Sequence, residues 1–310
     1  MPTINGTVYD SSGAGAAGRV VRVYRRDTGA LLGETVTSNG EATPGDTDYP
    51  SVVLLARADG SDGATTFVDK SSYSRAITAR GGAMTSSAVT VFGQPMMYFD
   101  GVNDYAECAS GPDFSLPGDF TFEAWAYPLL DDATDRWIFA NYSSSGTGGF
   151  AVGFNGGKPK VVKAGVTGVI VADTIAAPKN NLNYIRVVRS GTTVAMTVNG
   201  AASGSYTGAA DFVPSGTPRV ALGAFASAAD GSTAVAGSFF HGYLAVRLTK
   251  GVVRAGGVPT APFLESLDIP ATPLGSYSVG TVYTGEVQRI VLDDAAGTLH
   301  NDLIDRVMLA

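Results

Sequence analysis

The acidic residues between positions 100 and 123 are the first candidates for chemistry in this sequence. The carboxylates there include Asp100, Asp104, Asp113, Asp119 and Glu123. A glycosidase needs a pair of carboxylates that flank a sugar ring, and on one strand such a pair stands a residue or two apart. Glu123 lies in Phe-Thr-Phe-Glu-Ala-Trp-Ala, with no second acid in reach. The sequence therefore predicts no glycosidase pair here.

The remaining titratable residues do not form a catalytic pattern either. Asp131, Asp132 and Asp135 lie close together in a turn-rich stretch, which is typical of a solvated loop. The two histidines, His241 and His300, are expected in different domains. No Ser-His-Asp, Cys-His or multi-histidine site is predicted. We therefore expect no catalytic, cofactor-binding or metal residues and a protein that is not an enzyme.

Calcium is the one ion that the acidic residues are suited to bind. Hard oxygen ligands occur in two groups, Asp59 with Asp62 and Asp69, and Asp100 with Asn103 and Asp104. Asp-Gly and Asn-Asp steps are also ordinary turn sequences that need no metal. We expect no cofactor, and calcium at one of these groups is the alternative.

Aromatic residues offer a binding surface instead of a catalytic one. Tyr105, Tyr127 and Trp137 are candidates for a platform on which a sugar ring stacks. The alternative is that they pack in the core or against a sheet face, as aromatic residues on strands commonly do.

Composition limits the classes of partner. The chain has 310 residues and a net charge of −7, and its basic residues do not cluster, which argues against nucleic acid as a partner. The single cysteine, Cys108, excludes an intrachain disulfide and is expected to be a small buried residue rather than a nucleophile. The N-terminus lacks the features of a signal peptide, and no run is long enough for a membrane span, so we expect no membrane insertion.

Short strands separated by Gly, Ser, Asn, Asp and Pro indicate an all-β protein. In residues 119–126, Phe120 and Phe122 alternate with Thr121 and Glu123, which predicts a strand with one apolar and one mixed face. Residues 98–128 are expected to form a framework hairpin. Further strands are predicted at 51–56, 66–72, 136–141, 149–154, 160–163, 169–171, 183–191, 193–200, 219–223 and 239–250.

The two ends of the chain are predicted to form one small domain. Strands are expected at 4–9, 18–26 and 30–37, which are too few to close a core, and further strands at 275–279, 285–293 and 301–307. We predict a small β-sandwich from residues 1–42 and 270–310, split by a large β-domain over residues 49–268. The alternative is three successive domains.

Both predicted domains resemble known families. The strings Phe-Asp-Gly-x-Asn-Asp-Tyr at 99–105 and Gly-Asp-Phe-Thr-Phe-Glu-Ala-Trp at 118–125 resemble the laminin G-like, concanavalin A-like jelly rolls found in many bacteriophage structural proteins. The ends resemble the prealbumin-like carboxypeptidase regulatory sandwich. Its Gly-x-Tyr-x-Val strand is missing after Gly40 and appears at 275–279.

These resemblances imply a non-enzymatic bacteriophage virion protein, assembled in the host cytoplasm, at the tail tip or fibre or as a capsid decoration. The jelly roll would make adhesion contacts with a host surface glycan or with other virion proteins, and a homo-oligomer is expected in the particle. A glycan-degrading enzyme that uses Glu123 or Asp135 is the first alternative. A host cell-surface lectin is the second.

Overall fold

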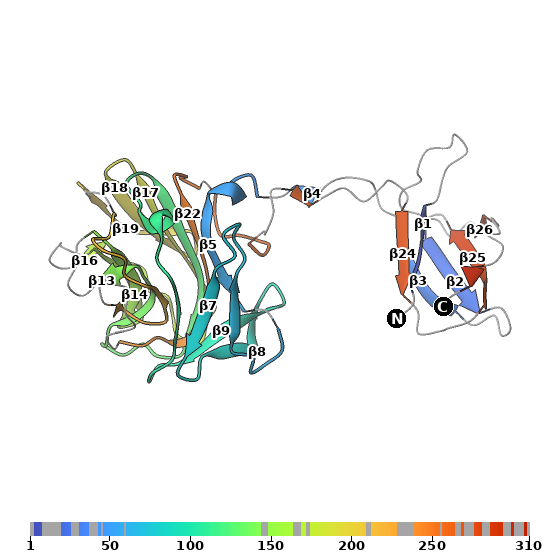
Figure 1. Cartoon of the computed structure of the whole chain (residues 1–310), viewed down its shortest axis with the longest axis horizontal. Coiled ribbons are helices and arrows are strands. Elements are labelled where there is room, and N and C mark those ends of the chain that lie inside the picture. The colour runs from blue at the N-terminus through green and yellow to red at the C-terminus, as the bar shows by residue number, and fades with distance from the viewer. Residues whose placement is uncertain are drawn as a thin grey trace. The chain divides into compact units, whose positions relative to one another are not determined.

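The structure is a computed structural model that divides into two compact units, residues 46–267 (the large unit) and residues 1–45 with 268–310 (the small unit) (Figure 1). It describes residues 46–58, 60–143, 148–163, 169–171, 174–208, 212–227, 238–254 and 256–263, and the backbone of the strands in the small unit. The predicted all-β class is confirmed, because the helices described are two short 3-10 turns, η1 (Tyr49–Ser51) and η2 (Pro112–Phe114).

The small unit pairs strands from both ends of the chain. The N-terminal β1 (Thr3–Thr7) pairs antiparallel with β24 (Ser276–Gly280), and β2 (Val20–Arg25) lies between β3 (Leu31–Val36) and β25 (Glu286–Asp293). Its other described strands are β4 (Thr43–Pro44), β23 (Asp268–Ile269), β26 (Leu299–His300) and β27 (Val307–Met308). Most of the strand expected at 301–307 lies outside the described residues.

In the large unit, 16 of the described strands form one continuous sheet. In chain order they are β5 (Val52–Arg57), β6 (Thr66–Asp69), β7 (Ala76–Arg80), β8 (Met84–Val91), β9 (Gln94–Asp100), β10 (Tyr105–Cys108), β11 (Phe120–Pro128), β12 (Arg136–Ala140), β14 (Phe150–Asn155), β15 (Lys158–Lys163), β16 (Val169–Val171), β17 (Asn183–Ser190), β18 (Thr193–Val198), β19 (Ala201–Thr207), β20 (Val220–Leu222) and β22 (His241–Lys250). A separate parallel pair consists of β13 (Tyr142–Ser143) and β21 (Ala226–Ser227).

The sheet folds back on itself, so that two layers enclose the core. Phe122 of β11 packs on Phe139 of β12 with 5.0 Å between ring centroids, and Phe120 packs on Phe150 of β14 at 5.2 Å. Phe120, Phe122 and Ala124 are fully buried in this core, as the alternation predicts. We call the side of β9, β22, β11 and β17 that points away from this core the outer face.

Residues 98–128 do not form the predicted hairpin. β9 and β11 do not pair with each other, because β22 lies between them and pairs with both. The stretch between them also contains an unpredicted strand, β10, in which Cys108 is buried as expected. Strands β7, β8 and β19 were not predicted either.

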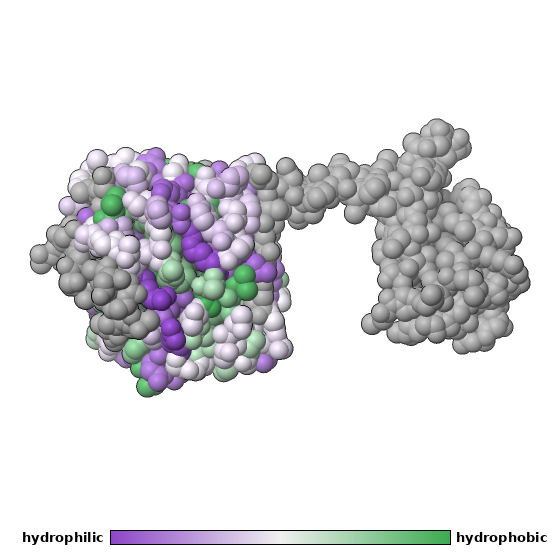
Figure 2. All heavy atoms as spheres, viewed as in Figure 1, coloured by the Kyte–Doolittle hydropathy of each residue, from purple (hydrophilic) through white to green (hydrophobic). Residues whose placement is uncertain are grey.

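The outside of the large unit is mixed in character. In Figure 2, hydrophobic residues on the face in view gather in a small area between strips of hydrophilic ones. Among the described residues, none of the helices combines the length and the apolar character that a membrane span requires.

Candidate functional site

Glu123 is buried in an ion pair on the outer face. It is the carboxylate of β11 that the sequence offers as a candidate catalyst. Its side chain is 3% exposed. Arg247 donates two hydrogen bonds to it, from Nε to Oε2 at 2.6 Å and from Nη2 to Oε1 at 2.8 Å. The hydroxyl of Tyr184 donates a third, at 2.6 Å, and burial followed by the charge of Glu123 raises the pKa of Tyr184. Both carboxylate oxygens are thus occupied by protein donors.

A second carboxylate extends this ion pair to the start of the large unit. Asp46 accepts from Arg247 Nη1 at 3.1 Å and from both Nη atoms of Arg254 at 2.9 Å. Nε of Arg254 donates to Thr249 Oγ1 at 2.8 Å. Two buried carboxylates and two guanidinium groups therefore compensate each other, which is the arrangement that buried charges require.

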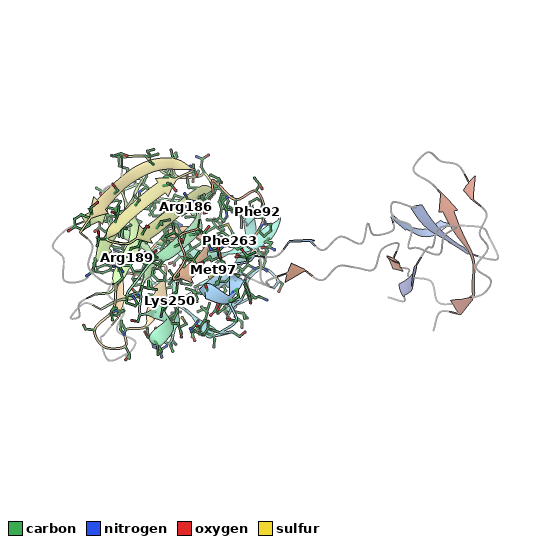
Figure 3. The ribbon with its side chains drawn as sticks, turned by 90° about the horizontal axis from the view of Figure 1, so that it is seen from above. Phe92, Met97, Arg186, Arg189, Lys250 and Phe263 are labelled. Atoms are coloured by element: carbon green, nitrogen blue, oxygen red, sulfur yellow. The ribbon has the colours of Figure 1, made fainter. Side chains whose placement is uncertain are left out.

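The chain after β22 returns across the outer face and covers this cluster. We call residues 252–254 and 256–263 the covering segment. Thr121 Oγ1 donates to the carbonyl of Val252 at 2.8 Å and accepts from Arg254 N at 2.9 Å. At the other end, the guanidinium of Arg247 stacks 4.3 Å from the ring centroid of Phe263, which is labelled in Figure 3. This half of the outer face is closed to ligands.

The other half of the outer face carries three tyrosines in one row. Tyr243 of β22 lies directly opposite Tyr98 of β9 on one side and Tyr127 of β11 on the other. The ring centroids are 5.0 and 5.8 Å apart, and all three side chains are partly exposed. A Cβ atom at Gly242 would come 2.2 Å from the carbonyl oxygen of Tyr127, so glycine is what allows β22 to approach β11 here. We call Tyr98, Tyr243 and Tyr127 the tyrosine row.

Polar groups lie at one edge of the tyrosine row. His241 lies opposite Asp100 in the β22–β9 ladder, and its ring centroid is 6.3 Å from that of Tyr98. Burial and the charge of Arg136 lower the pKa of His241, against an opposing effect of Asp100. Burial, followed by the neighbouring Tyr243, raises the pKa of Tyr98. Both pKa shifts favour the uncharged form, of the phenol in Tyr98 and of the imidazole in His241.

Residues 100–245 match a family model described as the concanavalin A-like lectin/glucanases superfamily. The large unit is a concanavalin A-like jelly roll. This confirms the resemblance that the strings at 99–105 and 118–125 carry.

The jelly roll also has similar solved structures. Domain 4 of AbnA, a GH43 extracellular arabinanase from Geobacillus stearothermophilus in complex with arabinotriose, is 13% identical, with a TM-score of 0.48, over 66% of this chain and 94% of that one. The botulinum neurotoxin serotype D binding domain is 8% identical, with a TM-score of 0.44, over 66% of this chain and 49% of that one. This chain thus spans about half the length of the toxin domain. No curated protein matches the sequence.

Three other acids that the sequence singled out, Asp131, Asp132 and Asp135, form ion pairs on the jelly roll. Asp131 pairs with Lys179 at 2.9 Å, and Asp135 pairs with Lys160. Asp132 accepts two hydrogen bonds from Arg136, which lower the pKa of its carboxyl group. Each of the three acids has a cation of its own, so they do not form a joint site.

The carboxylates that are candidate calcium ligands accept hydrogen bonds from other groups of the chain. Asp69 Oδ1 accepts from the amides of Leu55 and Ser71 at 2.9 and 3.0 Å, and Asp62 accepts from Ser87. Asp104 accepts from the amides of Gly82 and Asp100. Asp59 lies outside the described residues. Over the described part of the jelly roll, His, Cys, Asp and Glu side chains do not gather in groups of three that would hold a metal ion.

The three aromatic candidates do not form one platform. Trp137 is 3% exposed and packs against Phe225 with 4.6 Å between ring centroids, while Tyr105 stacks on Phe239 at 6.2 Å. Only Tyr127 belongs to the tyrosine row. Tyr98 and Tyr243, its partners, were missed because the pairing of β22 with both β9 and β11 has no local signal in the sequence.

Proposed function

We propose that this chain is a non-enzymatic bacteriophage virion protein whose jelly roll binds glycan on the host surface. The observation that carries the proposal is the tyrosine row, in which three partly exposed rings lie in register on three adjacent strands. Such rings offer flat apolar faces to a sugar and hydroxyl groups to its polar edge. The description of the matching family, which names lectins and glucanases, supports the same class of ligand.

The geometry favours binding without catalysis. A glucanase on this jelly roll would need two carboxylates that flank the sugar and are free to exchange protons. Glu123 accepts hydrogen bonds from Arg247 and Tyr184 beneath the covering segment, and Asp135 is bonded to Lys160 and Asn155. The alternative of a glycan-degrading enzyme therefore lacks an accessible pair among the acids weighed for it.

The virion assignment rests on the resemblance to bacteriophage structural proteins, and the small unit is consistent with it. Strands from both ends of the chain pair in that unit, so the jelly roll is inserted between its two halves. We propose that the small unit attaches the jelly roll to other virion proteins, in a homo-oligomer at the tail or on the capsid, during assembly in the host cytoplasm.

Mass spectrometry of purified virions tests the location. We expect peptides from both units in particles that have been freed of unassembled protein. Their absence from such particles, with the protein present in the lysate, would contradict the virion assignment and would favour a soluble enzyme or a host lectin.

Binding of the full chain to host capsule and lipopolysaccharide tests the glycan assignment. Tyr243→Ala removes the central ring of the tyrosine row, and we expect about tenfold weaker binding. Tyr206→Ala is the matched control, because Tyr206 is exposed on β19 and outside the row. Equal binding by the two variants would exclude the row as the site. Release of oligosaccharides by the unaltered chain, lost in Glu123→Gln or Asp135→Asn, would instead establish the enzyme.

A further inference from the structure

A hollow of about 310 Å³ lies on the jelly roll away from the tyrosine row. Its lining residues come from η1, the start of β5, the turn after β6, η2 and the end of β22: Pro50, Ser51, Val53, Tyr73, Pro112, Asp113 and Lys250. Lys250, labelled in Figure 3, lies opposite Phe120, whereas Tyr243 lies opposite Tyr127. The two places are thus seven residues apart along both strands, which corresponds to roughly 23 Å.

Tyr73 is the aromatic wall of this hollow, and Arg75 holds it in place. Tyr73 is 45% exposed. The guanidinium carbon of Arg75 lies 4.1 Å from the ring centroid of Tyr73 and 4.7 Å from that of Phe114 in the core. Arg75 therefore covers one face of Tyr73, and the exposed surface of Tyr73 is its other face and edge.

Arg75 is in turn fixed by two carboxylates. It donates to Asp69 at 3.0 Å and to Asp113, a second lining residue. Asp69 is fully buried and also accepts the amides of Leu55 and Ser71, so its position is set by the backbone. The exposed ring of Tyr73 thus stands on a rigid support rather than on a free loop, and ordering it on binding has little further entropic cost.

The remaining polar groups of the hollow have hydrogen-bonding capacity to spare. Lys250 Nζ donates to the carbonyl of Pro112 at 3.0 Å, and an ammonium group has three donors. The carboxylate of Asp113 can accept more hydrogen bonds than the one from Arg75. An acceptor and a donor of opposite charge therefore line the same hollow beside the exposed ring.

The exposed ring of Tyr73, the carboxylate of Asp113 and the ammonium group of Lys250 together determine which class of ligand fits the hollow. Asp69 and Asp113 balance the charges of Arg75 and Lys250, so the hollow attracts neither a strong anion nor a strong cation. A charged sugar gains no net attraction here, because Asp113 repels an acidic sugar that Lys250 attracts, and Lys250 repels an amino sugar that Asp113 attracts. A neutral ring with adjacent hydroxyl groups satisfies all three groups, because one hydroxyl donates to the carboxylate, another accepts from the ammonium group and the ring stacks on Tyr73.

We propose that this hollow is a second binding site of the jelly roll, which takes one neutral sugar ring against Tyr73 between Asp113 and Lys250. The proposal does not depend on the tyrosine row, because the two places share no residue. If both are occupied by one polysaccharide, the jelly roll binds bivalently, and its affinity for a long glycan exceeds its affinity for a single ring.

Saturation-transfer NMR on the full chain tests the site with the methyl glycosides of glucose, galactose and mannose as probes. For a ligand of this size we expect a dissociation constant on the order of 1 mM for at least one of them. Methyl glucuronide is expected to bind more weakly than the matching neutral glucoside. Tyr73→Ala is expected to weaken binding about tenfold, and Lys250→Met, which keeps the aliphatic stem, by a smaller factor.

The controls separate this site from the tyrosine row. Tyr206→Ala removes an exposed tyrosine elsewhere on the jelly roll and is expected to keep the signal. Tyr243→Ala is expected to remove only the part of the signal that the row contributes, and the part lost in Tyr73→Ala should persist in it. Tyr73→Phe keeps the stacked ring and is also expected to bind, which shows that the ring and not its hydroxyl group is required. An unchanged midpoint of urea unfolding in Tyr73→Ala shows that its loss of binding is not a folding defect. A signal that Tyr243→Ala abolishes and Tyr73→Ala leaves intact would overturn the second site and support the row. Failure of all three neutral glycosides to give a saturable signal would also overturn it.

Discussion

Glu123 lies directly opposite Arg247 in the β11–β22 ladder, and two hydrogen bonds of 2.6 and 2.8 Å join their side chains. The two residues are 124 positions apart in the sequence, and both side chains are less than a tenth exposed. Removal of Glu123 leaves two largely buried guanidinium groups, those of Arg247 and Arg254, with Asp46 as their buried carboxylate, so one positive charge lacks a buried partner. The pair therefore joins the two central strands on the outer face, in addition to occupying the one carboxylate on β11.

Glu123→Ala is accordingly expected to lower the free energy of unfolding of the jelly roll by ~3–5 kcal/mol. Tryptophan fluorescence during urea unfolding measures this unit alone, because both tryptophans of the chain, Trp125 and Trp137, lie in it. Asp131→Ala is the control, since it removes a surface ion pair and is expected to change stability by less than ~1 kcal/mol. Similar midpoints for the two variants would contradict the structural role of Glu123.

Asp46 and Asp48 provide a matched pair of acids at the start of the jelly roll. Asp46 is buried and accepts from Arg247 and Arg254, whereas Asp48 is more exposed and lies 3.6 Å from Arg254. Asp46→Asn is expected to destabilise the jelly roll by ~1–3 kcal/mol and to speed proteolytic cleavage of the covering segment. Asp48→Asn is expected to do neither, and equal cleavage of the two variants would show that Asp46 does not hold the segment.

Cys108 is expected to be inert toward thiol reagents in the folded protein. Its side chain is 3% exposed, and burial, followed by the charge of Asp69, raises the pKa of the thiol to about 12. Since the thiolate is the reactive form, labelling by a chromogenic disulfide near neutral pH should require unfolding. The labelling rate should therefore rise in parallel with the fluorescence change in urea, and rapid labelling without urea would refute the burial of Cys108.

The alternation of residues 119–126 was sufficient to predict which side chains of β11 enter the core. It did not indicate that the outer face would be buried as well, although Thr121 and Glu123 are 0% and 3% exposed. The groups that cover them come from Asp46 and from the covering segment, which are distant in the sequence. A local sequence pattern predicts which side chains share a face of the strand. It does not predict which distant segments pack against that face.

The same limit explains the unpredicted strands and the tyrosine row. Strands β8 and β19 are rich in Ser, Thr, Ala and Gly, and they contain few of the large apolar residues that mark a strand in a sequence. Tyr127 was singled out, but its neighbour Tyr243 is brought beside it by sheet order, with β22 inserted between β9 and β11. Composition and short periodicity therefore give the all-β class, and long-range pairing gives the candidate site.

His241 at the edge of the tyrosine row is expected to make the jelly roll less stable as the pH falls below about 6.5. Burial and the charge of Arg136 lower the pKa of His241 from its ordinary value of 6.5, while Asp100 acts in the opposite direction. The unfolded chain therefore binds a proton at a higher pH than the folded chain, and the free energy of unfolding increases with pH in the interval between the two pKa values. Urea unfolding followed by tryptophan fluorescence from about pH 7.5 to 5.5 measures this slope. In His241→Gln the slope should be smaller over that interval, and an unchanged slope would show that His241 does not titrate differently in the folded and unfolded states.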